Sequence, residues 1–259
     1  MINNSTAVLL KNLADRYETA EFIADDPVGA AHNTKDKRNT EITAFVSQWL
    51  AYGKREMFLK VMARISQDMG INPHQYICNR DFERFKGDNT CLYRFYTNHD
   101  YYCICERLHN VYFNEGKGVM SMEDVLKKHL KTKGQTDCIS VIRQIEELFK
   151  GVKGIPKDTA SACKRLCMFL RWMVRKNSPV DYGLWDIVQA KDLIIPLDTH
   201  VFKQSRKLGL TLRNDTSMKT ALEITNNLKH IFPSDPVRAD FALFGLGIDE
   251  VKNKSNNKG

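Results

Sequence analysis

Two residues of this sequence have chemically reactive side chains and lie at predicted helix starts, where their orientation would be fixed. Lys164 stands near the start of a helical pattern over residues 158–176, where the positive end of the helix dipole disfavours a charged ammonium group. Asp198 stands just before a second helical pattern that runs to residue 208, so its carboxylate is a predicted N-cap with a fixed direction. A neutral amine is a nucleophile, and a fixed carboxylate stabilises developing positive charge. Helix capping alone is the structural alternative for Asp198.

The pattern over residues 158–176 separates an apolar face from a basic face. At about 100° per residue, the apolar side chains fall on one side of the helix, whereas Lys164, Arg171 and Arg175 fall on another. Residues 150–176 hold eight Lys and Arg residues against one acid, in a chain whose formal net charge is +8. Such a segment favours an acidic partner such as nucleic acid, although a basic face exposed only to water has the same pattern.

The elements that must position these residues are helices. Apolar residues recur at three- and four-residue spacing along most of the chain, and no alternating strand pattern competes. The predicted helices span residues 7–24, 41–51, 58–69, 101–112, 139–149, 160–174, 201–208, 221–231 and 237–246. The predicted fold is therefore all-α. Its long irregular stretches, residues 24–39 and 177–196, are where function tends to be located.

Length and composition indicate an ordinary folded protein. The chain has 259 residues, of which 42% are hydrophobic and 27% charged, and these values exclude a disordered or fibrous chain. No apolar stretch approaches the roughly 18 residues of a membrane span, and residues 1–18 lack the pattern of a secretion signal. We therefore expect a cytoplasmic protein of a bacterial-type cytosol, with no membrane partner.

The seven cysteines are expected to be free thiols. Their number is odd, and their close pairs lack the C-x2-C spacing of a zinc ribbon, so no metal site is predicted. Cys163 and Cys167 lie four positions apart within an apolar helical pattern, which is typical of core packing.

The segment around Asp198 resembles the aspartate motif of helix-hairpin-helix DNA glycosylases. Pro196-Leu-Asp-Thr-His-Val201 is followed by Ser205-Arg-Lys-Leu-Gly-Leu210, and that superfamily has a Val-Asp-Thr-His-Val stretch followed by an Arg-Leu-Gly-Leu ending. The aspartate is catalytic in the superfamily, and bifunctional members add a lysine at the start of the helix that follows the hairpin. Lys164 matches that lysine by its position before an apolar helix.

A longer pattern is similar to the family called DUF2400. It comprises residues 163–175, 181–185, 196–200 and 235–247. Together with Asp26-Pro27 and residues 41–53, the resemblance covers most of the chain.

Three features depart from the glycosylase pattern. The Gly-x-Gly hairpin, whose amides grip a DNA phosphate, is replaced by residues 154–162, GIPKDTASA. Lys164 and Asp198 are 34 positions apart, which is wider than in most bifunctional members and similar to archaeal 8-oxoguanine glycosylases. The four-cysteine iron–sulfur motif is absent, so we expect no cluster and no other cofactor.

The resemblance implies two interlocked helical subdomains of the helix-hairpin-helix glycosylase type, with a degenerate hairpin, within a compact unit over residues 1–250. The helices of residues 40–150 would form mainly one subdomain, and residues 1–39 and 151–250 mainly the other. The helix over residues 160–176 and the start of the helix after Asp198 would line the cleft between them. Residues 251–259 are polar and are expected to form a disordered basic tail.

The function implied is a bifunctional DNA glycosylase and AP lyase that excises an oxidised purine, 8-oxoguanine, from double-stranded DNA. It would act as a nucleoid-associated monomer. Lys164 would attack C1′ of the flipped nucleotide, and Asp198 would assist the lysine and stabilise charge on the sugar. Two alternatives remain open: a non-catalytic DNA-binding protein, and a monofunctional glycosylase that uses Asp198 and water.

The remaining candidates would contact the DNA. Gln48 resembles the glutamine of a Ser-x-Gln stretch that glycosylases insert near the flipped nucleotide, although helical glutamines are common on surfaces. Substrate contacts by stacking or hydrogen bonding are predicted for Trp172, Trp185 and Asp240, with core packing as the alternative for the tryptophans. Phosphate contacts are predicted for Arg165, Arg171 and Arg175.

Overall fold

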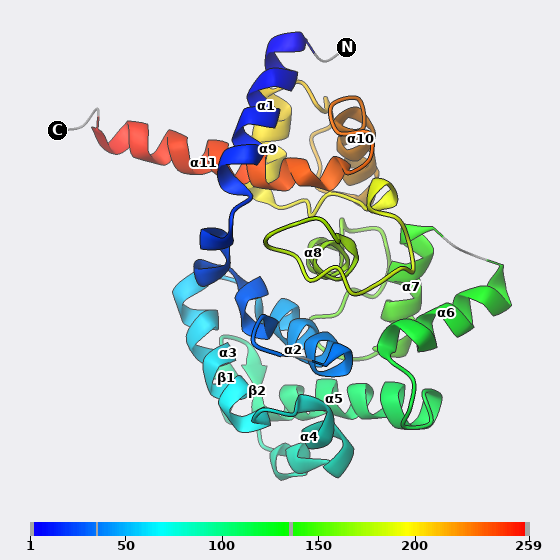
Figure 1. Ribbon diagram of the computed structural model, residues 1–259. Helices are drawn as coiled ribbons and strands as arrows, with labels where there is room; N and C mark the ends of the chain where they lie inside the picture. Colours follow the sequence, from blue (N-terminus) through cyan, green and yellow to red (C-terminus); the bar gives the residue numbers. More distant parts are fainter. Residues whose placement is uncertain (1–2, 35, 135–136, 257–259) are drawn as a thin grey trace. The chain divides into compact units, whose positions relative to one another are not determined.

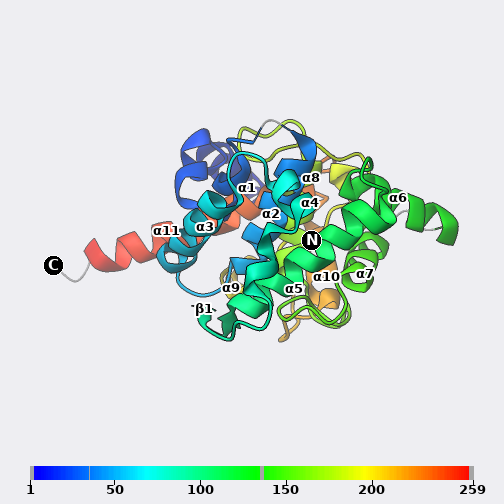
Figure 2. The ribbon, with the colours of Figure 1, turned by 90° about the horizontal axis from the view of Figure 1, so that it is seen from below.

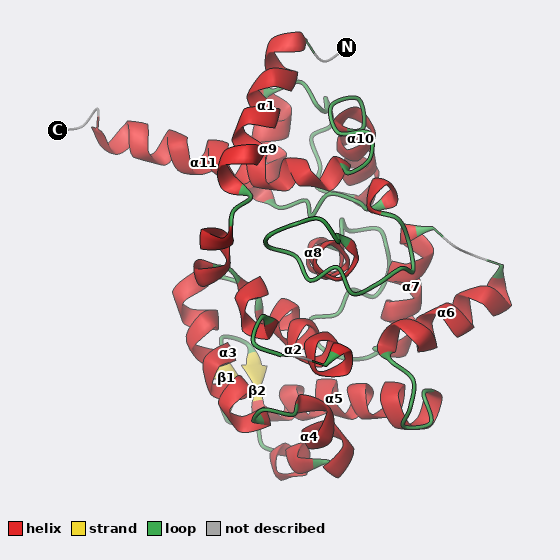
Figure 3. Cartoon of the chain, in the orientation of Figure 1, coloured by secondary structure: helices red, strands yellow, loops and turns green. Residues whose placement is uncertain are grey.

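Helices dominate the computed structural model, which describes residues 3–34, 36–134 and 137–256 (Figures 1 and 3). The sheet in these residues is one antiparallel pair of short strands, β1 (Cys91–Tyr93) and β2 (Tyr96–Thr97). The helical fold class expected from the spacing of apolar residues is therefore confirmed.

The chain divides into two units, one formed by Met1–Phe22 with Thr159–Gly259 and the other by Ile23–Asp158. Residues 23–39, which the prediction grouped mainly with the chain ends, belong to the second of these units. The short helix η2 (Pro27–Ala31) buries Pro27, Val28 and Ala31 and packs on α2 (Lys37–Leu50). The Ser47 hydroxyl donates a 2.7 Å hydrogen bond to the Pro27 carbonyl, which fixes η2 to the second unit.

The terminal segments form the first unit. Its elements are α1 (Asn4–Tyr17), α8 (Lys164–Val174), η5 (Ala190–Asp192), α9 (Thr199–Lys207), α10 (Met218–Leu228), η6 (Pro236–Arg238) and α11 (Ala239–Asn256), while η1 (Ala20–Asp25) spans the boundary between the units. α11 crosses α1, as Figures 1 and 2 show, and it also packs against α9. Gly245 permits the close approach of α1, since a Cβ there would lie 2.2 Å from the Tyr17 ring.

The C-terminal end of α11 extends into the segment that was expected to form a tail. The helix continues to Asn256 and so includes residues 251–256, for which the polar composition predicted disorder. Adding residues to an existing helix gains one hydrogen bond per residue without a new nucleation cost. The last predicted tail residues, 257–259, lie outside the described residues.

The second unit surrounds a nearly buried central helix, α2. Around it lie α3 (Arg55–Met69), α4 (Pro73–Asn79), η3 (Asp81–Phe85), α5 (Asn98–His109), the π-helical turn η4 (Asn110–Glu115), α6 (Met122–Lys133) and α7 (Cys138–Leu148). The fully buried Glu41 carboxylate of α2 accepts hydrogen bonds from the Tyr112 hydroxyl at 2.8 Å and the Met122 amide at 2.9 Å. The Glu41 carboxylate thus binds the N-terminal, positive end of α6, and this interaction compensates for the cost of burying its charge.

The loop after α8 closes the end of that helix. The amides of Tyr182 and Gly183 donate to the Trp172 carbonyl at 2.8 and 3.1 Å, and the Trp185 amide donates to the Met173 carbonyl at 2.7 Å. These bonds satisfy carbonyl groups that a helix end leaves without partners. In Figure 1 the loop winds around α8, which is seen along its axis.

Gly183 is the residue of this loop that tolerates no side chain. Its φ is +64°, and a Cβ would lie 2.6 Å from Lys176 Cα and 2.8 Å from the Arg175 carbonyl oxygen. Gly209, with φ +69°, has no atom within 4 Å of the place where its Cβ would lie.

The Gly209→Ala substitution should lower the free energy of unfolding by about 1–2 kcal/mol, the cost of a left-handed backbone. Gly183→Ala should cost about 1–3 kcal/mol more, because the backbone must also move. Urea unfolding measures both, and equal losses would contradict the steric argument.

Candidate functional site

The starts of two helices carry the predicted catalytic residues. Lys164 is the first residue of α8, which begins there because Cys163 adopts a left-handed backbone with φ 47°. Cys163 makes no side-chain cap hydrogen bond. Asp198 is the N-cap of α9, where its Oδ1 accepts hydrogen bonds from the His200 amide at 2.9 Å and the Val201 amide at 2.8 Å. The predicted capping role of Asp198 is therefore confirmed.

The structure brings Lys164 and Asp198 together across 34 positions of the sequence. Lys164 Nζ lies 3.6 Å from Asp198 Oδ2, and the two side chains are 36% and 34% exposed. One carboxylate oxygen thus holds the α9 amides while the other faces the amine. The pair is fixed on the protein side and remains accessible from solvent.

This arrangement suits proton transfer followed by nucleophilic attack. Asp198 Oδ2 is near enough to receive a proton from Nζ after a small side-chain movement. A neutral amine and an adjacent carboxylate form the combination required for attack on an electron-poor carbon.

Two arginines predicted to contact DNA phosphate are instead buried. Arg171 and Arg175 are only 3% and 2% exposed, and both donate to the carboxylate of Asp181, whose side chain is fully buried. Arg171 also pairs with Asp240. The predicted phosphate contacts of Arg171 and Arg175 are wrong, because a DNA backbone has no access to either guanidinium.

Arg175 pairs with carboxylates from two further segments. It donates to Glu18 at 2.6 Å and to Asp235 at 2.9 Å. Burial opposes its charge, but Asp181 and Asp235 outweigh this effect and raise the pKa of the Arg175 guanidinium. We call Arg171, Arg175, Glu18, Asp181, Asp235 and Asp240 the buried charge cluster.

The cluster is closed by an aromatic ring and a third arginine. The guanidinium carbons of Arg171 and Arg175 lie 4.6 and 5.4 Å from the centroid of the buried Phe241 ring. Arg238 donates to Glu18 at 2.7 Å. Burial raises the pKa of Glu18, but its attraction to Arg175 and the hydrogen bonds from both arginines outweigh this, so its pKa lies below the ordinary value.

The predicted substrate contacts near α8 also change. Trp172 and Trp185 are fully buried, and Trp185 packs edge-to-face on Phe169 at 5.2 Å, so neither ring offers a face to a nucleobase. The stacking prediction is therefore wrong, and the core alternative is confirmed. Asp240 lies at the start of α11 and is engaged by Arg171, which assigns it to the buried charge cluster instead of a base contact.

Two further predicted residues differ in exposure. Arg165 is the second residue of α8 and is partly exposed, so its phosphate contact stays a prediction. Gln48 belongs to α2 in the second unit and is 1% exposed. Its Nε2 has no hydrogen-bond partner among the described residues. Because the Gln48 side chain is as buried as those of Arg171 and Arg175, the structure does not support its predicted contact near a flipped nucleotide.

Cys163 and Cys167 are buried, as predicted for core packing. Within residues 3–34, 36–134 and 137–256, no group of three or more His, Cys, Asp or Glu side chains could hold a metal ion. No helix among the same residues is long and apolar enough to cross a membrane.

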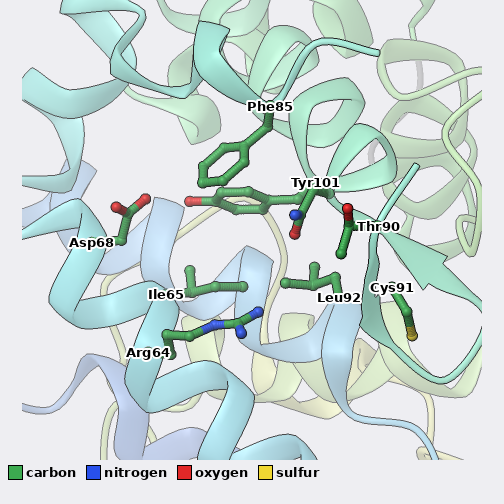
Figure 4. A pocket seen from close by; sticks show the side chains of 9 residues that line it. Arg64, Ile65, Asp68, Phe85, Thr90, Cys91, Leu92 and Tyr101 are labelled. Carbon is green, nitrogen blue, oxygen red and sulfur yellow. The ribbon is translucent and has the colours of Figure 1, made fainter. Parts of the chain in front are cut away.

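A pocket of about 300 Å³ lies in the second unit (Figure 4). The Tyr101 ring crosses it, with Phe85 on one side and Ile65 and Leu92 on the other, and Asp68 lies near the hydroxyl end. Its other lining residues are Arg64, Thr90, Cys91 and Asn98. None of the predicted catalytic or DNA-binding residues lines this pocket.

The sequence matches a family described as "Protein of unknown function (DUF2400)" over residues 26–249. The chain belongs to the DUF2400 family. Both members of the Lys164–Asp198 pair lie within the matched range, as does the whole buried charge cluster except Glu18. No curated protein and no solved structure matches the chain.

The buried charge cluster predicts a specific acid sensitivity. The folded-state pKa of Glu18 is lowered, so its ionised form stabilises the fold fully above the ordinary value of 4.5, and this stabilisation is lost as the pH falls through the folded-state pKa. Glu18→Gln should cost about 1–3 kcal/mol at pH 7. The difference from wild type should shrink below pH 4.5. Urea unfolding from pH 7 to about pH 3 measures it.

The control for this experiment is Glu147→Gln, since that side chain is 64% exposed and lies 4.0 Å from Lys150 at the surface. It should change stability by less than about 0.5 kcal/mol. A Glu18→Gln deficit that stays constant with pH would show that packing, and not ionisation, is lost.

The capping role of Asp198 predicts that two substitutions at this position differ in their effect on stability. Asp198→Ala removes the oxygen that caps α9 and should lower the free energy of unfolding by about 1 kcal/mol. Asp198→Asn keeps an acceptor at the same place and should remain within about 0.5 kcal/mol of wild type. Thermal or urea unfolding distinguishes them. Equal losses in both variants would mean that the negative charge, and not the cap, supports the helix.

Proposed function

We propose that this DUF2400 protein is a DNA glycosylase with AP lyase activity, in which Lys164 is the nucleophile and Asp198 assists it. The observation that supports this most directly is the 3.6 Å separation of Lys164 Nζ and Asp198 Oδ2. The two residues come from separate helix starts, and Asp198 is oriented by two backbone amides. The carboxylate of an ordinary surface ion pair is not fixed in this way, whereas that of Asp198 is held by backbone amides.

The proposed reaction begins with a damaged nucleotide flipped out of the duplex. Asp198 Oδ2 takes a proton from the Lys164 ammonium, and the neutral Nζ attacks C1′ of the deoxyribose. The C1′–N bond to the base breaks, and the base leaves with the bonding electrons and takes up a proton. The Asp198 carboxylate stabilises the positive charge that develops on the sugar, because it is already fixed in direction.

The lyase step follows from the covalent intermediate. Opening of the C1′–O4′ bond leaves a protonated Schiff base between Nζ and C1′, and O4′ takes up a proton. Loss of a proton from C2′ then drives elimination at C3′, which breaks the C3′–O3′ bond and releases the 3′ phosphate. Water finally hydrolyses the Schiff base and restores Lys164.

The proposed substrate is an oxidised purine, 8-oxoguanine, in double-stranded DNA. This choice depends on the 34-position separation of Lys164 and Asp198 and its similarity to archaeal 8-oxoguanine glycosylases. The formal net charge of +8 is consistent with an acidic polymer as partner. Arg165 is retained as a phosphate contact, whereas Arg171 and Arg175 anchor α8, the helix that carries Lys164.

Lys164→Gln should abolish both base release and the adduct that borohydride traps between protein and damaged duplex, because the amine is lost. DNA binding should change little, since one of many charges is removed. Asp198→Asn should lower the rate of base release about 10²–10³-fold, the effect of losing one preorganised transition-state group. Gel separation of the trapped adduct and release of the base from labelled duplex measure the two steps.

Lys203→Gln is the matched control, because Lys203 is an exposed lysine of α9 and the charge change is the same. It should leave trapping unchanged. Trapping by Lys164→Gln would assign the nucleophile to another lysine. Base release without trapping by wild type would favour a monofunctional glycosylase that uses Asp198 and water, and binding without either reaction would favour a non-catalytic DNA-binding protein.

A further inference from the structure

Two exposed aromatic rings meet on the surface of the second unit, far from α8 and α9 in the sequence. Tyr52 and Phe95 are 45% and 44% exposed, and their ring centroids are 5.2 Å apart. Tyr52 belongs to the turn between α2 and α3, and Phe95 belongs to the tip of the β1–β2 hairpin. Figure 1 shows this hairpin beside α3, and the contacts of β1 with α3 agree.

Buried groups hold both rings in place. The Tyr93 hydroxyl donates to the Tyr52 carbonyl, which ties the turn to the hairpin. The Phe95 ring packs on the fully buried Tyr96 ring at 4.6 Å, and Tyr96 in turn lies 4.2 Å from the fully buried Trp49 ring and donates to the Trp49 carbonyl at 3.4 Å. The Tyr52 backbone and the Phe95 ring are therefore tied to buried aromatic residues, which limits the conformational freedom that is lost when a ligand binds.

Cations lie against the same rings. The Arg94 guanidinium carbon is 5.1 Å from the Tyr52 ring centroid, and Lys153 Nζ is 5.7 Å from the Phe95 centroid. Lys153 also pairs with Asp100 at 3.1 Å, whereas Arg94 has no carboxylate partner among the described residues. Exposed Lys54 follows in the same turn as Tyr52. The surface thus combines aromatic faces with positive charge.

This combination fits one kind of partner best. Every nucleobase has a flat face that stacks on an aromatic ring, and phosphates of the same strand attract nearby arginine and lysine side chains. An apolar peptide or a second apolar protein surface would gain nothing from the cations and would have to remove their hydration on binding. Bases in an intact duplex are already stacked, so a protein ring can reach only unpaired or unstacked bases.

We propose that Tyr52, Phe95, Arg94 and Lys153 form an aromatic platform that binds unpaired bases of a nucleic acid strand. The two rings stack on bases, and the two cations bind the adjoining phosphates. The platform acts on undamaged strands and does not require the Lys164–Asp198 chemistry. It adds a nucleic-acid contact to the second unit, whose predicted DNA contact was Gln48.

The test is equilibrium binding of the full chain to an undamaged single-stranded oligonucleotide, followed by fluorescence anisotropy. The double variant Tyr52→Ala, Phe95→Ala should weaken binding about tenfold or more, within the range for losing base stacking. The exchange variants Tyr52→Phe and Phe95→Tyr keep the rings and should bind within about twofold of wild type, a far smaller change than the loss of a stack. Ile71→Ala is the matched control, because Ile71 is an exposed apolar side chain of the same unit and is 100% exposed.

A second measurement does not depend on any variant. An oligonucleotide with 2-aminopurine in place of adenine should lose fluorescence on binding wild-type protein, because the base stacks on a ring. Wild type that does not bind the strand, binding without quenching, or equal affinity of wild type and the double alanine variant would each overturn the proposal. Lys164→Gln should bind the strand as wild type does, so loss of glycosylase activity and loss of the platform are separate outcomes.

Discussion

The buried guanidinium groups of Arg171 and Arg175 tie four segments of the first unit to one helix. They meet at the fully buried Asp181 carboxylate of the loop after α8, and their other partners are Glu18 just after α1, Asp235 just before η6 and Asp240 of α11. Removing one partner from such a cluster leaves a buried charge with less compensation, which destabilises the fold. The position of α8 therefore depends on carboxylates supplied by distant parts of the chain.

The candidate site depends on this constraint through α8. Lys164 stands at the exposed start of the helix whose other end is fixed by the cluster and by the Gly183 turn. Asp198 is positioned independently, since α9 amides bind one of its oxygens and α11 packs on α9. A reactive pair that is half exposed can still be well oriented when its supporting helices are held by buried charge and packing. The proposed catalytic geometry follows from that support.

Local sequence patterns predicted the helical class, the cap and the buried cysteines, but they did not predict which acidic side chains pair with the arginines. The helical class, the Asp198 cap and the buried cysteines followed from spacing and residue type. The eight cations of residues 150–176 suggested a basic surface, but Arg171 and Arg175 are neutralised by acids from outside that segment. The β1–β2 hairpin was missed because it is too short to show an alternating pattern. Because Phe95 lies at the tip of this hairpin, the sequence did not predict that the exposed rings of Tyr52 and Phe95 meet.

The sequence by itself determined most of the helical stretches and, at Asp198, the cap of one helix, because caps, dipoles and apolar spacing act within a few neighbouring positions. It also indicated that Lys164 and Asp198 each stand at a helix start. Only the tertiary structure decided that the two meet at 3.6 Å and that Arg171 and Arg175 are buried against acids. Electrostatic and stacking partners are set by distance in space, and residues 18, 181, 235 and 240 reach α8 only when the chain is folded.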